Sequence, residues 1–268
     1  MPGHLLESFQ GEPPVVSNNI LELKILRKNF GGVVAVSDLS LKIEQGSISS
    51  LIGPNGAGKT TIFNLVTGFL EPSSGHIMFA GRIVNKMKPH AIAAIGIGRT
   101  FQNVQIFPKM SVLENIMVGR HLRSRAGILY SCILPPFLRK EEKLIQEAAQ
   151  EQLHFLDLEQ YAHTPAGSLP LGNQRMLEIA RALALEPKLL LLDEPASGLN
   201  ARETIAMGEL IEKIKQMNIT VLLVEHDMEL VMDISDYVAV INFGRLIAEG
   251  PPVEIQENKD VIAAYLGE

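Results

Sequence analysis

The segment Gly53-Pro-Asn-Gly-Ala-Gly-Lys59-Thr60 carries the clearest chemical pattern in the sequence. It matches G-x-x-x-x-G-K-[ST], a loop that binds phosphate groups through its backbone N–H groups and a lysine. We expect Lys59 to contact the β- and γ-phosphates of a nucleotide and the Thr60 hydroxyl to bind Mg²⁺. The candidate nucleotide-binding residues of this loop are Gly53, Pro54, Asn55, Gly56, Ala57, Gly58, Lys59, Thr60 and Thr61.

Ionisable side chains follow two apolar runs further along the chain. Asp193 and Glu194 come directly after the run 189–192, and His226 follows the run 220–224. Ligands of open α/β sheets bind beyond the carboxyl ends of strands, so these groups are expected beside the phosphate loop. Asp193 suits the Mg²⁺ shell, and Glu194 suits a general base that polarises the attacking water. Taken alone, the two carboxylates could be solvated acids; the complete phosphate loop favours catalysis.

The elements that must position these residues follow an α/β pattern. Short apolar runs rich in β-branched residues alternate with helical periodicity, which predicts a largely parallel sheet flanked by helices. Period-two alternation near the start predicts antiparallel strands. Strands are expected at 20–25, 39–43, 47–52, 75–79, 82–84, 189–192, 220–224, 237–242 and 245–249. Helices are expected at 59–67, 141–156, 202–217 and 253–266.

The stretch between the two α/β pieces has helix formers and no convincing strand, which predicts an inserted helical subdomain. The fold class is therefore a P-loop NTPase core with an antiparallel β subdomain and a helical subdomain. The predicted units are a flexible tail at 1–19, a nucleotide-binding core with the β subdomain at 20–102 and 171–250, a helical subdomain at 103–170, and a C-terminal helical tail at 251–268.

Composition narrows the classes of function. The formal net charge of −6 argues against a general nucleic-acid binder, which usually carries a basic face. The single cysteine, Cys132, rules out an internal disulfide framework and fits a reducing compartment. No run reaches the roughly 18 to 20 apolar residues that span a bilayer, and 1–19 lacks the pattern of a secretory signal. We expect a cytoplasmic protein that reaches a membrane by docking onto other proteins.

The order and spacing of these motifs resemble the ATP-binding subunits of ABC transporters over roughly residues 20–268. Gln102 is similar to the Q-loop glutamine, which senses the metal site and couples it to the membrane partner. Phe30 resembles the aromatic residue that stacks on adenine. The segment 197–200 occupies the D-loop position, and His226 that of the switch histidine, which would reach the γ-phosphate.

This resemblance implies a set of cofactors and roles. The cofactors are ATP and Mg²⁺. Glu194 and His226 would be catalytic, and Thr60, Gln102 and Asp193 would lie around the metal ion. In the family, two ATPase subunits sandwich two ATP molecules, and a signature motif of one subunit faces the γ-phosphate bound by the other.

The signature departs from the family pattern L-S-G-G-Q. The aligned segment is Leu169-Pro-Leu-Gly-Asn173, so Pro170 stands at the serine position and offers neither a hydroxyl nor an N–H donor. Leu171 and Asn173 replace the first glycine and the glutamine, and Gly172 is retained. We expect Leu171, Gly172 and Asn173 to contact the nucleotide bound by the other subunit. The two subunits should close on ATP less tightly at this face, which favours a different polypeptide as the partner ATPase.

Further features resemble the ATPase subunits of branched-chain amino acid importers: the irregular signature, the long insertion 119–143, and the segments 224–228 and 264–268. This resemblance implies permease subunits, a second ATPase subunit and an extracytoplasmic solute-binding protein as partners, and a place on the cytoplasmic face of the inner membrane. Whether the ATPase pair is homomeric or heteromeric stays open.

Several alternatives to amino acid import remain at this point. The same kind of ATPase subunit could power urea or amide import or lipopolysaccharide export. A non-transport ABC ATPase of DNA repair or ribosomes is less favoured, because the chain has one cassette and no heptad run long enough for a coiled coil. A silent regulatory cassette is disfavoured by the intact Lys59, Asp193, Glu194 and His226.

Overall fold

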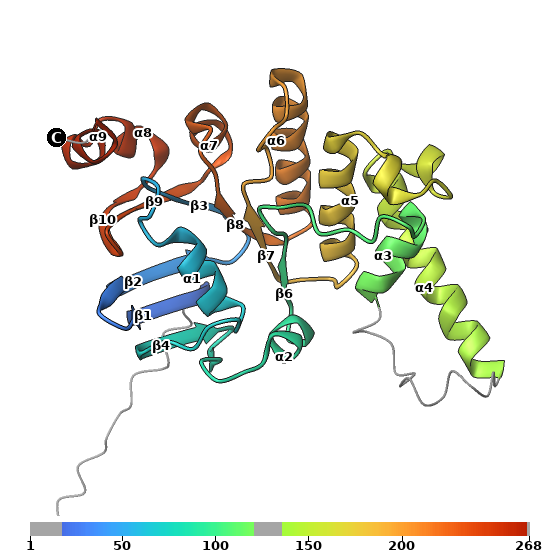
Figure 1. The fold of residues 1–268 in the computed structure, drawn as a ribbon, viewed down its shortest axis with the longest axis horizontal. Coiled ribbons are helices and arrows are strands. Elements are labelled where there is room, and N and C mark those ends of the chain that lie inside the picture. The colour runs from blue at the N-terminus through green and yellow to red at the C-terminus, as the bar shows by residue number, and fades with distance from the viewer. Residues whose placement is uncertain (1–17, 121–135, 267–268) are drawn as a thin grey trace, which may run out of the picture.

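In the computed structural model, which describes residues 18–120 and 136–266, the strands form two sheets. The larger sheet has the order β10-β9-β3-β8-β7-β6, and the smaller has the order β2-β1-β4-β5. Figure 1 shows the smaller sheet below one end of the larger and helices α3, α4 and α5 at the opposite end of the molecule. The tail at 1–17 and the part of the insertion at 121–135 lie outside the described residues.

The larger sheet is built on three strands whose residues are all buried: β3 (Ile48–Ile52), β7 (Leu189–Asp193) and β8 (Thr220–Val224). They are parallel to one another and to the flanking strands β6 (Ile97–Arg99) and β9 (Tyr237–Asn242), and β10 (Arg245–Gly250) pairs antiparallel with β9. Strands covered on both faces give continuous apolar runs, which is why the sequence revealed the three inner strands.

The smaller sheet is antiparallel. Its first three strands run longer than the sequence predicted, and the last ends one residue earlier. They are β1 (Asn19–Phe30), β2 (Val33–Glu44), β4 (Ser74–Phe79) and β5 (Arg82–Ile83). Ile25 and Asp38 have positive φ angles of 47° and 52°, and the β1–β2 register shifts around them. Each irregularity moves the following side chains to the other face, so the period-two pattern stops although the strand continues.

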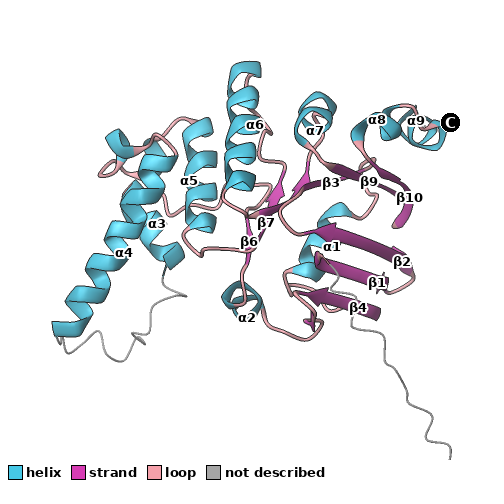
Figure 2. Ribbon diagram, turned by 180° about the vertical axis from the view of Figure 1, so that it is seen from behind, coloured by secondary structure: helices cyan, strands magenta, loops and turns pink. Residues whose placement is uncertain are grey.

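Helix α1 (Lys59–Val66) lies between the two sheets (Figure 1, Figure 2). Its buried residues Ile62, Phe63 and Val66 belong to one apolar cluster with strands of both sheets. Because both sheets hold the helix, the loop that precedes it has a fixed position.

Other short helices complete the core. The sequence did not predict α2 (Pro89–Ala94) and α7 (Met228–Ile234), which are too short to show a clear period. The predicted helical stretch 253–266 is two helices, α8 (Pro252–Gln256) and α9 (Lys259–Leu266). None of the described helices combines the length and the apolar character that crossing a bilayer requires.

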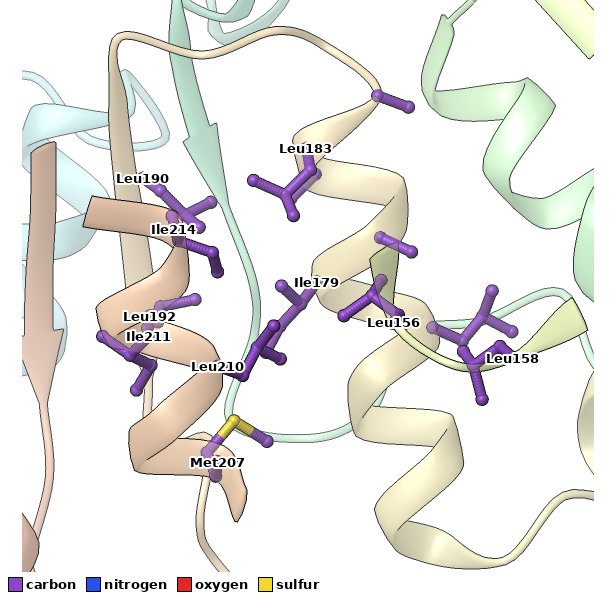
Figure 3. Packing of buried hydrophobic residues seen from close by; sticks show 14 of the residues in the cluster. Leu156, Leu158, Ile179, Leu183, Leu190, Leu192, Met207, Leu210, Ile211 and Ile214 are labelled. Atoms are coloured by element: carbon purple, nitrogen blue, oxygen red, sulfur yellow. The ribbon is translucent and has the colours of Figure 1, made fainter. Parts of the chain in front are cut away.

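The opposite end of the molecule is helical. It contains α3 (Val112–Arg120), α4 (Pro136–Phe155), the short 3₁₀ turns η3 (Glu159–Tyr161) and η4 (Ala166–Ser168), and α5 (Leu171–Leu183). Helix α6 (Ala201–Gln216) lies on the sheet side of α5, between α5 and α7 (Figure 1). Figure 3 shows side chains of α5 and α6 pointing toward each other beside Leu190 and Leu192 of β7, with Leu156 and Leu158 on the other side of α5. Helix α5 therefore packs against the helical end on one side and against α6 and the sheet on the other.

We predict that Gly119→Ala destabilises the protein although alanine favours a helix by about 1 kcal/mol. A Cβ at Gly119 of α3 would lie 2.2 Å from the backbone oxygen of Arg181 on α5. Overpacking of this kind costs about 1–3 kcal/mol, so thermal unfolding should show a lower Tm. Gly208→Ala on α6 is the control, because its Cβ would meet side-chain carbons, Cδ1 of Leu230 at 3.0 Å and Cγ2 of Ile234 at 3.4 Å, and no backbone atom. An unchanged or raised Tm for Gly119→Ala would contradict the close α3–α5 packing.

Candidate active site

The phosphate loop connects β3 to α1 and depends on glycine at two close approaches. Gly53 and Gly58 have φ angles of 153° and 108°. A Cβ at Gly53 would lie 2.0 Å from the backbone oxygen of Ile241, and one at Gly58 would lie 2.6 Å from that of Ala35. The loop thus lies tightly packed between β2 and β9, and only glycine fits both positions.

Lys59 begins α1 and is 6% exposed. Its Nζ donates hydrogen bonds to the backbone oxygens of Gly53 (2.6 Å) and Pro54 (3.2 Å), so the ammonium group lies inside the phosphate loop. Burial lowers the pKa of Lys59, while the charges of Glu194 and Asp193 act in the opposite direction. The first turn of α1 carries no acidic residue, so its helix dipole and free N–H groups also favour an anion here.

Asp193 is the last residue of β7 and is 2% exposed. Its Oδ2 accepts a hydrogen bond from the guanidinium of Arg99 at 3.0 Å, and its backbone N–H donates to the Thr100 hydroxyl at 3.3 Å. Burial raises the pKa of Asp193, and the hydrogen bond and charge of Arg99 oppose that rise. The carboxylate is therefore held in one orientation by Arg99, the last residue of β6.

Glu194 turns away from the direction of β7. Its φ of 51° is left-handed, a conformation that is uncommon for a residue with a Cβ and that is often found where function requires it. Its Oε2 accepts a hydrogen bond from Gln102 Nε2 at 3.0 Å, and its Oε1 lies 2.9 Å from His226 Nε2. The structure thus brings together three predicted residues from the loops after β6, β7 and β8.

The remaining predicted residues lie apart from this group. Phe30 ends β1 and is 46% exposed, with Lys28 Nζ 5.2 Å from the centroid of its ring. Leu171, Gly172 and Asn173 form the first turn of α5. Within the described residues, no hydrogen bond joins this turn to the phosphate loop. The turn that carries the signature residues instead faces the start of α6, where a Cβ at Gly172 would lie 3.1 Å from Glu203 Oε1.

Two buried charged residues of α5 were missed by the sequence analysis. Arg175 donates hydrogen bonds to the backbone oxygens of Gln102 (2.8 Å) and Ser197 (3.3 Å). Glu178 accepts hydrogen bonds from the backbone N–H groups of Phe101 (3.1 Å) and Gln105 (3.3 Å), and burial raises its pKa. Charged residues three positions apart on an otherwise apolar helix face are the sequence signal that could have found them.

Glu225 was also missed as a site residue. It is 3% exposed, and its carboxylate accepts hydrogen bonds from the backbone N–H groups of Ala196 (2.7 Å), His226 (2.9 Å) and Asp227 (3.5 Å). Burial raises the pKa of Glu225, and these three donors oppose the rise. Glu225 therefore ties the loop after Glu194 to the loop that carries His226.

The donor set around the phosphate loop fits a metal ion that arrives with a nucleotide. Among the described residues, no three His, Cys, Asp or Glu side chains are arranged to hold a metal ion on their own. Mg²⁺ is usually bound through one or two protein oxygens together with substrate phosphates and water. The hydroxyl of Thr60 in the first turn of α1 and the carboxylate of Asp193 supply such a pair.

Comparison with known protein families gives two matches. Residues 36–197 match the family model described as ABC transporter. Residues 245–268 match the model described as branched-chain amino acid ATP-binding cassette transporter.

Individual relatives match nearly the whole chain. The high-affinity branched-chain amino acid transport ATP-binding protein BraF of Pseudomonas aeruginosa is 46% identical over 94% of this chain and 100% of its own. The corresponding protein LivG of Escherichia coli K12 is 42% identical over the same shares. A solved nucleotide-free ATP-binding cassette from an ABC transporter superimposes with a TM-score of 0.81 at 31% identity, covering 93% of this chain and all of that one. An ATP-binding cassette in its ADP conformation gives the same TM-score and identity over 93% of this chain and 99% of its own.

We predict that Glu225→Gln lowers kcat for ATP hydrolysis about tenfold, equivalent to about 1.4 kcal/mol, and changes ATP affinity less than about twofold. The glutamine NH₂ would face a backbone N–H, so one buried donor would lose its acceptor and the loop carrying His226 would loosen. Steady-state kinetics and nucleotide titration measure the two effects. The control is Glu229→Gln, an exposed position in the first turn of α7. An equal loss of kcat in both variants would contradict the role of Glu225.

Proposed function

Because this chain belongs to the family of ABC transporter ATP-binding proteins, we propose that it powers the import of branched-chain amino acids. ATP hydrolysis by such a subunit is coupled to transport. The observation that supports ATP hydrolysis is the position of Lys59, Glu194 and His226 at the carboxyl ends of three parallel strands of one sheet. The names of BraF and LivG and the match of residues 245–268 support the substrate class.

In the proposed reaction, Glu194 accepts a proton from the water that attacks the γ-phosphate. Gln102 and His226 hold the two oxygens of its carboxylate, so the base is oriented before the nucleotide binds. Lys59 and the N-terminus of α1 stabilise the charge on the phosphate oxygens. Mg²⁺ bound by Thr60 and Asp193 would add positive charge at the β- and γ-phosphates.

The proposed partners are a second ATPase subunit, two permease subunits and an extracytoplasmic solute-binding protein, with this chain on the cytoplasmic face of the inner membrane. Each ATP lies between the phosphate loop of one ATPase and the signature turn of the other. That turn begins α5 with Pro170 at the N-cap, where no side chain caps the helix. The turn keeps the free backbone N–H groups of a helix start but lacks the serine hydroxyl of the family pattern, and this departure supports a partner ATPase of different sequence.

The proposed link to the permease runs through the helical end of the molecule. A displacement of α3 or α4 moves α5, because these helices share one apolar cluster. Arg175 of α5 holds the backbone of Gln102, and Gln102 contacts Glu194. The state of the membrane partner therefore reaches the catalytic base through two hydrogen bonds.

We predict that Glu194→Gln keeps ATP binding but abolishes turnover, because the amide cannot accept the proton of water. In cells that lack this gene, the wild-type chain should restore uptake of labelled leucine, isoleucine and valine, and Glu194→Gln should not. Glu212→Gln, an exposed glutamate on α6, is the matched control. Turnover retained by Glu194→Gln would remove this residue from its role. Uptake that does not depend on the wild-type chain would refute the proposed substrate.

We predict that Pro170→Ser increases the ATPase rate of the assembled transporter several-fold, because a serine hydroxyl adds a donor toward the γ-phosphate of the partner site. Serine at an N-cap also stabilises a helix by about 1 kcal/mol, so Tm must be recorded alongside the rate. Pro170→Ala removes the ring without adding a hydroxyl and separates the two effects. An equal rate in the serine and alanine variants would contradict the prediction.

A further inference from the structure

Arg99 lies at the end of β6 with 7% of its side chain exposed, and its guanidinium bridges two elements of the site. One terminal nitrogen donates to Asn64 Oδ1 at 2.7 Å and to the Thr67 hydroxyl at 3.1 Å, both on the helical side of the phosphate loop. The other donates to Asp193 Oδ2 at 3.0 Å. A planar guanidinium can hold acceptors on two sides in fixed directions, which a lysine ammonium cannot do.

Aromatic rings surround the same guanidinium. Its central carbon lies 4.9 Å from the ring centroid of Phe101, 5.5 Å from that of Phe63 and 6.0 Å from that of Phe69. Phe69 and Phe101 also meet edge to face, with centroids 6.0 Å apart. Rings at these distances stabilise a cation and keep water away from it. The Arg99 side chain is thus held in one position independently of its ion pair with Asp193.

The residues on α1 share one face of the helix. Thr60, Asn64 and Thr67 are spaced i, i+4 and i+7, which places them in one stripe along the helix and its C-terminal end. Arg99 holds two members of this stripe, and the third is the threonine proposed to bind Mg²⁺. The same guanidinium holds the other proposed Mg²⁺ ligand, Asp193.

Stability alone does not account for this arrangement. Taking two charges out of water is costly, and apolar residues of similar size often stabilise a protein as well as a buried ion pair does. Arg181 shows that a partly buried arginine can lie over a ring, that of Phe107, at 5.8 Å without a hydrogen bond to the Mg²⁺ ligands proposed here. What distinguishes Arg99 is that its hydrogen bonds connect the phosphate-loop helix to the acid of β7.

We propose that Arg99 is a positioning residue that fixes Asp193 relative to Thr60 and so sets the geometry in which the protein receives the metal ion of the metal–nucleotide complex. The inference rests on the proposed function, since it requires Thr60 and Asp193 to be the protein ligands of Mg²⁺. Its consequence is that loss of Arg99 weakens binding of the nucleotide only when Mg²⁺ is present. Ligand-orienting partners of this kind are typically worth 10- to 100-fold in metal affinity.

The test is a titration of the purified full-length chain with fluorescent ATP, with Mg²⁺ and with EDTA. Arg99→Met should weaken binding about tenfold with Mg²⁺ and less than about twofold with EDTA, and should raise the Mg²⁺ concentration for half-maximal binding about tenfold. Arg99→Lys should recover part of this loss. Arg181→Met, which also removes an arginine that lies over an aromatic ring, should bind as the wild type does under both conditions. Equal weakening with Mg²⁺ and EDTA, or the Arg99 pattern in Arg181→Met, would overturn the proposal.

A second variant covers the case in which Arg99→Met does not fold. Asn64→Ala removes one α1 acceptor of Arg99 and leaves the contact with Asp193 in place. It should raise the Mg²⁺ requirement about threefold without changing affinity in EDTA, and an unchanged Mg²⁺ requirement would overturn the bridge. Binding is measured without turnover or uptake, so this outcome is distinct from a failure of Glu194→Gln or of the import assay.

Discussion

The carboxyl ends of β3, β7 and β8 lie at one edge of the larger sheet, because the three strands are parallel and buried on both faces. The phosphate loop follows the first of these strands, Glu194 the second and His226 the loop after the third. Parallel strands require crossover connections, so these residues are far apart in sequence and neighbours in space. This topology brings the site residues together. A substitution that shifts the register of an apolar strand would therefore move the site residue that follows it.

The edge of the sheet supplies the residues, but contacts made elsewhere set their orientation. Glu225 braces the loops after β7 and β8 through backbone N–H groups. Arg175 holds the backbone of Gln102 from α5, and Arg99 holds Asp193 from β6. Each of these groups is charged and buried, and each would be costly to bury without these partners. The buried charges therefore form a frame around the more accessible Glu194 and His226.

The sequence predicted the parts of the fold that local patterns determine. The phosphate loop, the inner strands and α1 have a motif or a continuous apolar run, and the structure confirms these elements. Strand β6 was not predicted, because its three residues include Gly98 and Arg99 and form no apolar run. The roles of Arg99, Arg175 and Glu225 were not predicted for a related reason. A charged residue is expected to be exposed, and only the tertiary contacts show that it is buried and hydrogen-bonded.

The two halves of each proposed composite site place different demands on the chain. The half that contains the phosphate loop needs charged groups in fixed positions. The buried residues Arg99, Arg175 and Glu225 provide this by holding Asp193, Gln102 and the loops that carry Glu194 and His226. The signature half needs donors that reach outward. The first turn of α5 offers its backbone N–H groups, but Leu171 is apolar and exposed, and Pro170 at the N-cap has neither a hydroxyl nor an N–H group. The charge-stabilising groups of this chain are therefore concentrated on its own phosphate loop. In a pair with a different ATPase, the site built on this chain's phosphate loop would receive the partner's signature, and it would be the better equipped of the two if that signature is complete.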